Sequence, residues 1–449
     1  MASEDSCLDL SQFQNTEEES FDKTIQAFHT LMPFKVREIL LVSSMYDAFI
    51  VEEEGLISEL VIEEYRHLLL SSPPRVTQVT SGKQALSKVK NNKYDLVITM
   101  SKNIGTDPFE FGKQIKNECP DLPVIVLATD TADLHICQEH VSEEGVDKAF
   151  FWYGDTSLFI AIVKYVEDKI NVKYDTVNGN VQVIIVLEDS IRDYSMLLPV
   201  IYSEIVQQTQ RSISDDLNEM QRLLRRRARP KILLTDNYEE GMELYNKYKY
   251  YILGVISDVK FPKTGKLNPQ AGHDFIQHVK NDNPYVPTLL QSTDPKNRNR
   301  AEKLGAFFIH KNSPTLMQDF NHFMLKHLGF GDFVFLRPTK AHKKGEKDKA
   351  HHELTEEITR ASNLEEFEKV LQKIPLESIR FHANRNDFSN WLMARGEFKL
   401  AKKLRPQKVS DFTTLDEMRK YLVNVFNESR CEKQLSIMTD FSQQKFEFD

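Results

Sequence analysis

Short apolar runs alternate with helix-like stretches between residues 37 and 170. The runs read as buried strands of a parallel sheet, because such strands are hydrophobic along their whole length. Between them, apolar residues recur every three or four positions, as in amphipathic helices. The expected strands are 37–44, 75–80, 94–100, 122–130 and 147–153. This order predicts a doubly wound α/β domain with right-handed crossovers.

The same pattern starts again at residue 182 and continues to about residue 328. Its expected strands are 182–189, 231–236, 252–258, 286–294 and 306–311. The two stretches can be laid on one another, LLVSS on IVLED, LATD on QSTD and DKAFF on LGAFF. Repetition of a whole pattern indicates a fold more strongly than any single strand does. We therefore predict two doubly wound, five-stranded, parallel-sheet domains in tandem.

The pattern changes on either side of this repeat. The first 33 residues are mostly polar and acidic, and residues 337–353 are basic and free of large apolar side chains. Beyond residue 354 apolar residues recur at helical spacing, which predicts an all-α segment. The expected division is 1–33 acidic tail, 34–175 first α/β domain, 180–332 second α/β domain, 333–353 basic linker and 354–449 helical C-terminal segment.

Composition and charge exclude several classes of protein. The chain has 449 residues and a net charge of −9, so no basic footprint for nucleic acid is present. No apolar run approaches the roughly 20 residues of a membrane helix, and the acidic N-terminus lacks the features of a signal peptide. Cys7, Cys119, Cys137 and Cys431 have no metal-binding spacing. We expect a cytoplasmic protein without a membrane or nucleic-acid partner.

Polar residues that could carry chemistry follow the strands of the second domain. Glu188 and Asp189 end its first strand, Asp258 its third and Lys311 its fifth, while Ser292 lies near the end of the fourth. The carboxyl ends of these strands meet at one edge of the sheet. Clustered carboxylates are suited to Mg²⁺, a hard cation that prefers oxygen ligands. With the metal bound, Asp258 could act as a nucleophile toward phosphorus.

Each of these residues has a plainer interpretation when taken alone. An aspartate after a strand is commonly a helix cap or a turn residue, and a Glu-Asp pair is commonly solvated. A single serine or lysine indicates nothing. The phospho-acceptor interpretation is favoured because all five residues occur in one domain at matching positions.

This set resembles the receiver domain of bacterial response regulators, which has a flavodoxin-like fold. The resemblance covers residues 181–330 and rests on the five residues above together with Pro262. It implies that Asp258 is the phospho-acceptor, that Glu188 and Asp189 bind Mg²⁺ with it, and that Ser292 and Lys311 contact the phosphoryl group. The sequence departs from the family in two places. Asn312 stands where the family has proline, and the first helical region is extended over 207–229.

The first domain lacks this set of residues. Ser43 and Ser44 take the positions of the acidic pair, Met100 that of Asp258 and Ala128 that of Ser292. No lysine occurs over 149–157. The domain therefore resembles a receiver that has lost its chemistry, a pseudo-receiver. It could serve as an interaction or dimerisation surface, or only as a packing partner for the second domain, and the sequence favours neither.

Two further stretches have functional and structural interpretations. Residues 207–229 combine a helical apolar spacing with the run RRRAR and could bind a partner or a second copy, although a packing helix is the commoner case. Residues 380–406 mix polar side chains such as His382 and Arg395 with an apolar stripe that includes Trp391. A buried hydrogen-bond network explains that run better than a ligand site.

The run 380–406, with GFGDFVF before it, resembles a segment that follows a receiver-like region in bacterial phosphoenolpyruvate synthase/pyruvate phosphate dikinase-like proteins. Neither a glycine-rich nucleotide loop nor a glycine-flanked catalytic histidine is found, so the enzyme part of that resemblance is missing. The resemblance implies a regulatory front half of such a phosphotransferase. It leaves open whether the helical segment belongs to an enzyme's catalytic body.

The sequence supports two main functional hypotheses. The first is a phosphorelay regulator with Mg²⁺ as cofactor, in which a histidine kinase or a small phosphodonor phosphorylates Asp258. The alternative is a non-phosphorylated interaction module that regulates a phosphoenolpyruvate synthase-like phosphotransferase in cis or in trans. No helix-turn-helix pattern follows residue 330, so we expect no DNA-binding output.

Overall fold

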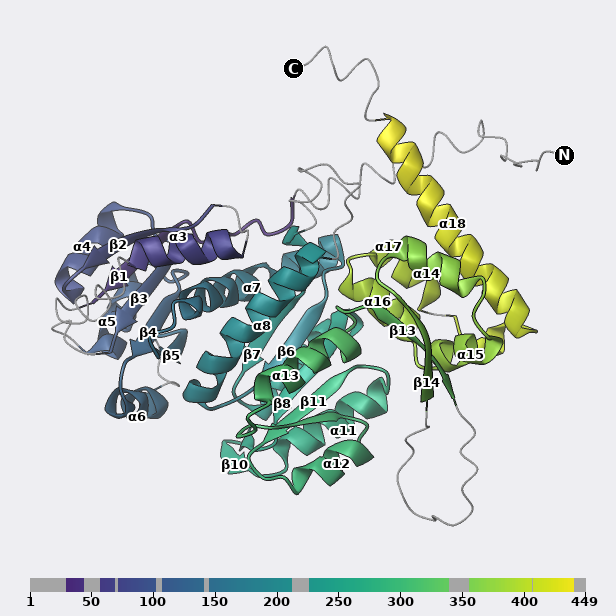
Figure 1. Cartoon of the computed structure of the whole chain (residues 1–449). Helices are drawn as coiled ribbons and strands as arrows, with labels where there is room; N and C mark the ends of the chain where they lie inside the picture. The colour runs from purple at the N-terminus through teal and green to yellow at the C-terminus, as the bar shows by residue number, and fades with distance from the viewer. Residues whose placement is uncertain are drawn as a thin grey trace.

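The computed structural model describes residues 30–43, 57–68, 72–101, 107–140, 145–211, 226–338, 355–405 and 407–439. The first α/β unit consists of β1 (Glu38–Val42), α3 (Ile57–His67), β2 (Arg75–Val79), α4 (Gly82–Asn91), β3 (Leu96–Met100), α5 (Pro108–Glu118), β4 (Val124–Ala128), α6 (Thr131–His140), β5 (Lys148–Phe151) and α7 (Ser157–Gly179). Its strands pair in parallel in the order β2-β1-β3-β4-β5 (Figure 1).

The second α/β unit repeats this architecture. It contains β6 (Val183–Leu187), α8 (Ile191–Arg211), β7 (Lys231–Thr235), α10 (Tyr238–Tyr248), η2 (Lys249–Tyr251), β8 (Ile252–Asp258), α11 (Ala271–Asp282), β11 (Thr288–Ser292), α12 (Asn297–Lys303), β12 (Phe307–His310), α13 (Leu316–His322) and η3 (Phe323–His327). The order β12-β11-β8-β6-β7 equals that of the first sheet when strands are counted within each unit. The prediction of two five-stranded parallel sheets is confirmed.

A hairpin not predicted from the sequence follows β8. Strands β9 (Phe261–Lys263) and β10 (Lys266–Asn268) pair antiparallel around Thr264 and Gly265. Both turn residues have positive φ, of 53° and 71°, as a two-residue hairpin turn requires. Gly272 then lets α11 begin directly against Asp258, because a Cβ there would lie 2.0 Å from the Asp258 carbonyl oxygen. The close start of α11 fixes the backbone around Asp258.

The C-terminal region opens with a hairpin that the sequence analysis did not predict. Strand β13 (Phe333–Pro338) pairs antiparallel with β14 (Thr355–Ala361), where we expected a linker from residue 333 and helices from 354. The exposed, charged residues of β14 give no apolar alternation that would mark it as a strand. The helical elements that follow are α14 (Leu364–Leu371), α15 (Leu376–Asn384), α16 (Asp387–Ala394), α17 (Phe398–Leu404), η4 (Val409–Asp411) and α18 (Leu415–Thr439).

The polar residues of the run 380–406 are bonded within the fold of the C-terminal region. Nε2 of His382 accepts the Leu336 N–H at 2.8 Å, and its Nδ1 lies 2.8 Å from Asp387 Oδ2. Arg395 donates to the carbonyl oxygens of Gly329 and Gly331, and its guanidinium lies 3.9 Å from the centroid of the Trp391 ring. These contacts support the structural interpretation of the run.

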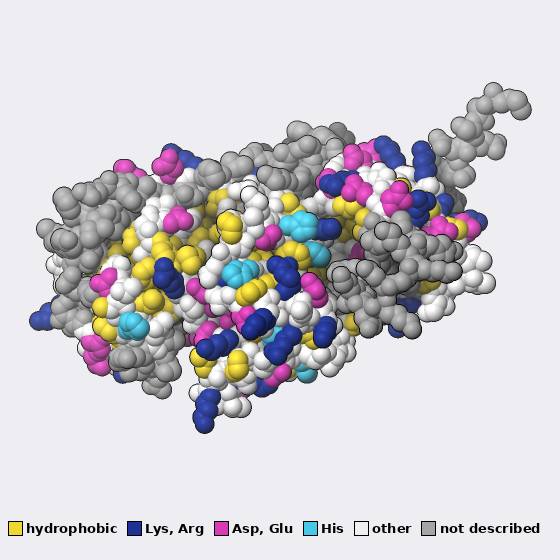
Figure 2. Space-filling view, turned by 60° about the horizontal axis from the view of Figure 1, so that its bottom comes forward, with side chains coloured by type: hydrophobic (Ala, Val, Ile, Leu, Met, Phe, Trp, Pro, Cys, Tyr) yellow, Lys and Arg dark blue, Asp and Glu magenta, His cyan; other side chains and the backbone are white. Residues whose placement is uncertain are grey.

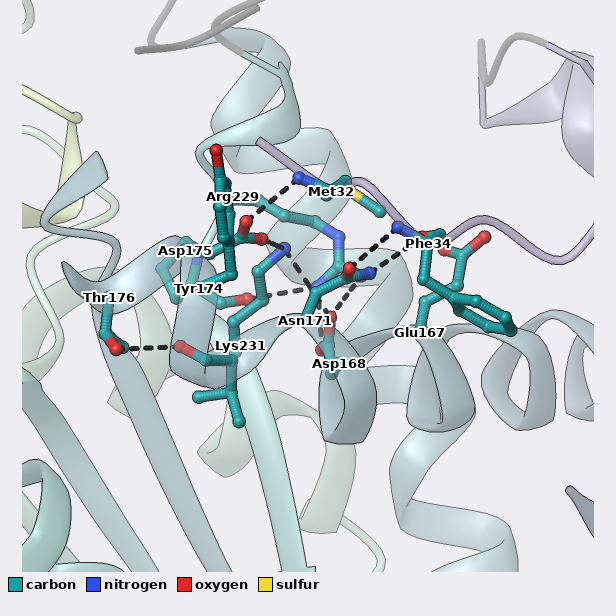
Figure 3. A network of polar contacts seen from close by, with 12 residues as sticks. Met32, Phe34, Glu167, Asp168, Asn171, Tyr174, Asp175, Thr176, Arg229 and Lys231 are labelled. Carbon is teal, nitrogen blue, oxygen red and sulfur yellow. Dashed lines mark hydrogen bonds and ion pairs between the residues drawn. The ribbon is translucent and has the colours of Figure 1, made fainter. Parts of the chain in front are cut away.

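Helix α7 joins the two α/β units through its polar side (Figure 3). Glu167, Asn171 and Asp175 lie four residues apart, so they face the same direction. Their side chains accept the backbone N–H groups of Val36, Phe34 and Met32 in turn, at 3.2, 3.0 and 2.9 Å. Two residues of extended chain advance about as far as one helical turn, roughly 6 Å. The segment before β1 is thus held by side chains of α7 at every second residue.

The second unit also contacts α7, through ion pairs with two of its aspartates. Lys231 begins β7 and lies 2.8 Å from Asp175, and Arg229 donates to both carboxylate oxygens of Asp168. All four side chains are almost completely buried. Buried ion pairs tolerate little change, because loss of one partner leaves an uncompensated charge. Helix α7 continues to Gly179 and packs against elements of both units.

The buried hydrophobic residues form three clusters, of which the largest crosses the unit boundaries while the other two lie mainly in the second and the first unit. One continuous cluster contains Ile98 and Phe150 of the first unit, Tyr194 and Ile256 of the second, and Trp391 of the C-terminal region. In the part of the chain that the structure describes, no helix is both long enough and apolar enough to cross a membrane.

Candidate functional site

Asp258 is the last residue of β8, a strand in the middle of the second sheet. The residue is 8 % exposed, and its Oδ2 accepts the N–H of Lys260 at 2.9 Å. The neighbouring strands β6 and β11 are parallel to β8, so their carboxyl ends lie beside Asp258. The sequence prediction that Asp258 stands at this edge is therefore matched by the register of the strands.

Glu188 and Asp189 follow β6 directly and turn toward Asp258. The N–H of Glu188 extends the sheet by donating to the Thr235 carbonyl, which fixes where its buried side chain points. One carboxylate oxygen from each of Glu188, Asp189 and Asp258 lies within 4.8 Å of the others. Among the described residues this is the one group of three or more potential metal ligands.

Lys311 lies just past the end of β12 and reaches the same carboxylates. Its Nζ is 2.7 Å from Glu188 Oε2 and 2.9 Å from Asp258 Oδ1. A third carboxylate, Asp193 Oδ2 in the first turn of α8, lies 2.8 Å away. Asp193 was missed in the sequence, although it stands four residues after Asp189. Asn312 in place of proline does not keep Lys311 from the site.

Burial and like charge both act on the acids of this cluster. Burial raises the pKa of the Glu188 carboxyl, although Lys311 opposes the shift. Burial, and after it the charge of Asp258, raise the pKa of Asp189 to about 6. Burial alone would lower the pKa of Lys311, but Glu188, Asp258 and Asp193 raise it above its ordinary value. Lys311 therefore stays protonated, and its single positive charge does not balance the three carboxylates around it.

Ser292 lies at the same edge but is bonded to other groups. Gln291 is paired with Asp258 in the sheet, and Ser292 follows it as the last residue of β11. Its hydroxyl oxygen accepts the N–H of Asp294 at 3.1 Å and the side-chain amide of Asn297 at 2.9 Å. The hydroxyl proton is not used in these two bonds and can be donated. Glu188, Asp189, Asp258 and Lys311 thus form one cluster. Ser292 lies at the same edge and bonds to Asp294 and Asn297 instead.

The first unit also supplies a charged residue near this edge. Lys148 Nζ, at the start of β5, is 2.7 Å from Oδ2 of Asp236, which follows β7. The ammonium also lies 5.2 Å from the centroid of the Tyr194 ring. Burial would raise the pKa of Asp236, but the charge of Lys148 and the hydrogen bonds from Lys148 and Asn237 together lower it. Neither residue was predicted from the sequence, although Asp236 follows a strand as Asp258 does.

The corresponding edge of the first unit carries neutral groups. Ser43 accepts a hydrogen bond from the side chain of Gln78 at 2.7 Å, and Met100 and Ala128 are buried. Ser44 lies outside the described residues. The nearby carboxylate of Asp133 is bonded to the hydroxyl of Ser101 at 2.5 Å. Among the described residues of this unit, no group of three or more potential metal ligands lies together.

The donor atoms at the edge of the second sheet fit a hard divalent cation. All three potential ligands are carboxylates, and their oxygens are close enough to share one ion. Glu188, Asp189 and Asp258 would hold the ion; burial raises the pKa of Glu188 and of Asp189, and the negative charge of Asp258 adds to both shifts. Figure 2 shows lysine and arginine side chains gathered over the second unit, beside acidic ones.

Solved structures similar to parts of the chain include response regulators and a signal receiver domain. A signal receiver domain of an HD domain-containing protein from Pseudomonas fluorescens Pf-5 is 18% identical, with 32% of this chain and 94% of that chain covered and a TM-score of 0.24. A probable two-component system response regulator/GGDEF domain protein is 14% identical over 65% of this chain and 98% of its own, with a TM-score of 0.26. NtrX from Brucella abortus is 10% identical, covers 64% and 63%, and has a TM-score of 0.25.

At such scores these likenesses add nothing to the strand orders given above. Residues 349–427 match a family of unknown function, DUF5752, which covers β14 and most of the helices after it. No curated protein matches the chain.

Proposed function

We propose that this protein is a signal-transduction regulator that accepts a phosphoryl group on Asp258 of its second α/β unit. One observation carries the proposal. Lys311 Nζ lies 2.9 Å from Asp258 Oδ1, and carboxylate oxygens of Glu188 and Asp189 lie within 4.8 Å of an Asp258 oxygen. An aspartate that only caps a helix or forms a turn does not require a lysine and two further carboxylates beside it. In the same proposal residues 180–332 form the receiver domain and residues 34–175 a pseudo-receiver.

The chemistry that these residues support is phosphoryl transfer. A carboxylate oxygen of Asp258 attacks phosphorus in a phosphohistidine or a small acyl phosphate, and a new P–O bond forms. The donor's P–N or P–O bond breaks, and the imidazole or carboxylate leaves with the electron pair. A bound Mg²⁺ would neutralise phosphoryl oxygens during transfer. Partners in this proposal are a histidine kinase or a small phosphodonor in the cytoplasm.

The other residues around Asp258 would stabilise the product. Lys311 can exchange a carboxylate partner for a phosphoryl oxygen, because it holds three acids at once. Ser292 can donate its free hydroxyl proton to another phosphoryl oxygen. The movements of Lys311 and Ser292 would alter contacts of α8 and β11, so the phosphorylated state would differ in conformation from the unmodified one.

The test is phosphorylation of the full chain by acetyl phosphate with Mg²⁺. We expect a covalent, hydroxylamine-sensitive phosphate on the wild type and on the control Asp294→Asn, whose carboxylate lies at the same edge. Asp258→Asn should take up none. If the wild type stays unmodified and binds no Mg²⁺, the proposal is lost. The alternative, a non-phosphorylated module regulating a phosphoenolpyruvate synthase-like phosphotransferase, would then be favoured.

A further inference from the structure

A groove of about 450 Å³ opens between the second unit and the C-terminal region. Its volume lies in the range of small-molecule sites. It is lined by residues that precede strands, Gln182 before β6 and Tyr251 before β8. Asp258 and Glu188 lie at the carboxyl ends of the same two strands. The groove is therefore at the opposite end of the sheet from the carboxylate cluster.

Three cations line this groove, Lys249, Lys402 and Arg405, and none forms an ion pair with a carboxylate among the described residues. Lys402 donates to the side-chain oxygen of Asn180, and Arg405 donates to the Tyr250 carbonyl at 3.4 Å. Lys249 lies across the groove, with its Nζ 5.3 Å from the centroid of the Tyr250 ring. The acceptors of Lys402 and Arg405 are neutral oxygens, so the positive charges are not compensated.

The one carboxylate in the lining, Asp282, is already bonded elsewhere. Its Oδ2 accepts the hydroxyl of Tyr245 at 3.0 Å. Burial, and then the charge of Arg405, lower the pKa of Lys402, and burial lowers that of Arg405. Lys402 and Arg405 lie at the C-terminal end of α17, and Lys249 is the C-cap of α10, so each cation is placed where the helix dipole favours positive charge. An anion in the groove would relieve all three charges.

The remaining lining suits a flat apolar group. Tyr250 is 75 % exposed, and Met393 is buried on the opposite wall. A nucleobase stacks readily on an exposed aromatic ring. We propose that this junction groove binds a nucleoside phosphate, with its phosphates between Lys249, Lys402 and Arg405 and its base on Tyr250.

Such a ligand would join two parts of the molecule. Lys249 and Tyr250 belong to η2 of the second unit, whereas Lys402 and Arg405 belong to α17 and its C-cap in the C-terminal region. Binding would hold these regions together across the groove. The proposal does not depend on phosphorylation of Asp258.

The experiment is calorimetric titration of the full chain with ADP in the presence of EDTA. Without a divalent cation, the carboxylate cluster repels phosphate and does not contribute. Inorganic diphosphate and adenosine are titrated separately. We expect ADP to bind at least tenfold more tightly than either part alone, and the affinity to fall as salt is added.

Variants assign the binding to the groove. The double variant Lys402→Met, Arg405→Met should weaken ADP binding at least tenfold, while Lys403→Met leaves it unchanged, because Lys403 on the same helix pairs with Glu428 instead. Tyr250→Leu should weaken ADP but not diphosphate. Asp258→Asn should bind ADP as the wild type does. Far-ultraviolet circular dichroism checks that each variant is folded.

Three results would overturn the proposal. The first is no heat of binding at millimolar ADP. The second is unchanged ADP affinity in the folded double variant. The third is diphosphate bound as tightly as ADP with no effect of Tyr250→Leu, which would exclude a nucleotide as the ligand. Each of these outcomes is independent of whether acetyl phosphate modifies Asp258.

Discussion

At the scale of single residues, Lys311 is the group on which the carboxylate cluster depends. Its ammonium lies within 2.9 Å of Glu188, Asp193 and Asp258. We expect Lys311→Met to lower the free energy of unfolding by about 3 kcal/mol, because buried acids are left without a counter-charge. Mg²⁺ should restore much of this loss, since it supplies the missing charge.

Urea unfolding with and without Mg²⁺ measures this effect. Lys296→Met, at an exposed position near the same sheet edge, is the control and should change stability little. Equal stability of Lys311→Met and the wild type in EDTA would contradict the assigned role of Lys311.

The raised pKa of Asp189 predicts a pH dependence of metal binding. The folded carboxyl titrates at about 6, above its ordinary value of 3.8, so below pH 6 a proton occupies it and competes with Mg²⁺. Affinity should therefore fall as pH is lowered, by up to about tenfold per pH unit below 6. Calorimetry at pH 5, 6 and 7 measures this, and Asp189→Asn should make the profile less steep, while a proton on Glu188, whose pKa burial raises to about 8, still competes with Mg²⁺.

The raised pKa of Asp189 also determines how the stability of the metal-free protein changes with pH. Between about pH 4 and 6 the folded chain retains a proton on Asp189 that the unfolded chain has released. This group therefore makes the metal-free protein less stable as pH rises through that range.

At the scale of elements, the contact of α7 with residues 32–36 depends on side chains rather than on a backbone ladder. Asn171 accepts the Phe34 N–H at 3.0 Å and donates to the Phe34 carbonyl at 2.7 Å. We expect Asn171→Ala to cost about 2 kcal/mol, because two partly buried backbone groups lose their partner. Asn178→Ala on the exposed side of the helix should change stability by less than about 0.5 kcal/mol. Urea denaturation of both variants makes the comparison, and equal losses would contradict it.

The sequence predicted the elements of the two sheets better than the contacts between them. Continuous apolar runs mark buried parallel strands, and residues that follow such strands meet at one edge, so Glu188, Asp189, Asp258 and Lys311 could be placed together. Asp193 could not, because its contact with Lys311 depends on the direction in which α8 leaves β6. Strand β14 was missed for want of an apolar alternation, and the hairpin β9–β10 because its strands are only three residues each.

At the scale of the whole molecule, one hydrophobic cluster contains residues of both units and of the C-terminal region, and this predicts cooperative unfolding. The two tryptophans report on different regions, since Trp152 follows β5 of the first unit and Trp391 lies in α16. Both belong to one buried cluster. In Trp391→Phe and in Trp152→Phe, the single remaining tryptophan should therefore follow the same transition as far-ultraviolet circular dichroism. Two separate midpoints within one variant would show that the regions unfold independently.

The position of α7 has a practical consequence for dissecting this protein. A fragment that starts at residue 180 would keep every strand of the second sheet but would leave Lys231, completely buried in the intact chain, without Asp168 and Asp175. A fragment that stops at residue 179 would expose the carboxylates that Arg229 and Lys231 now cover. Recombinant pieces cut between the two repeats should therefore be poorly soluble, whereas a piece that begins at Ser157 carries the helix that the second sheet requires.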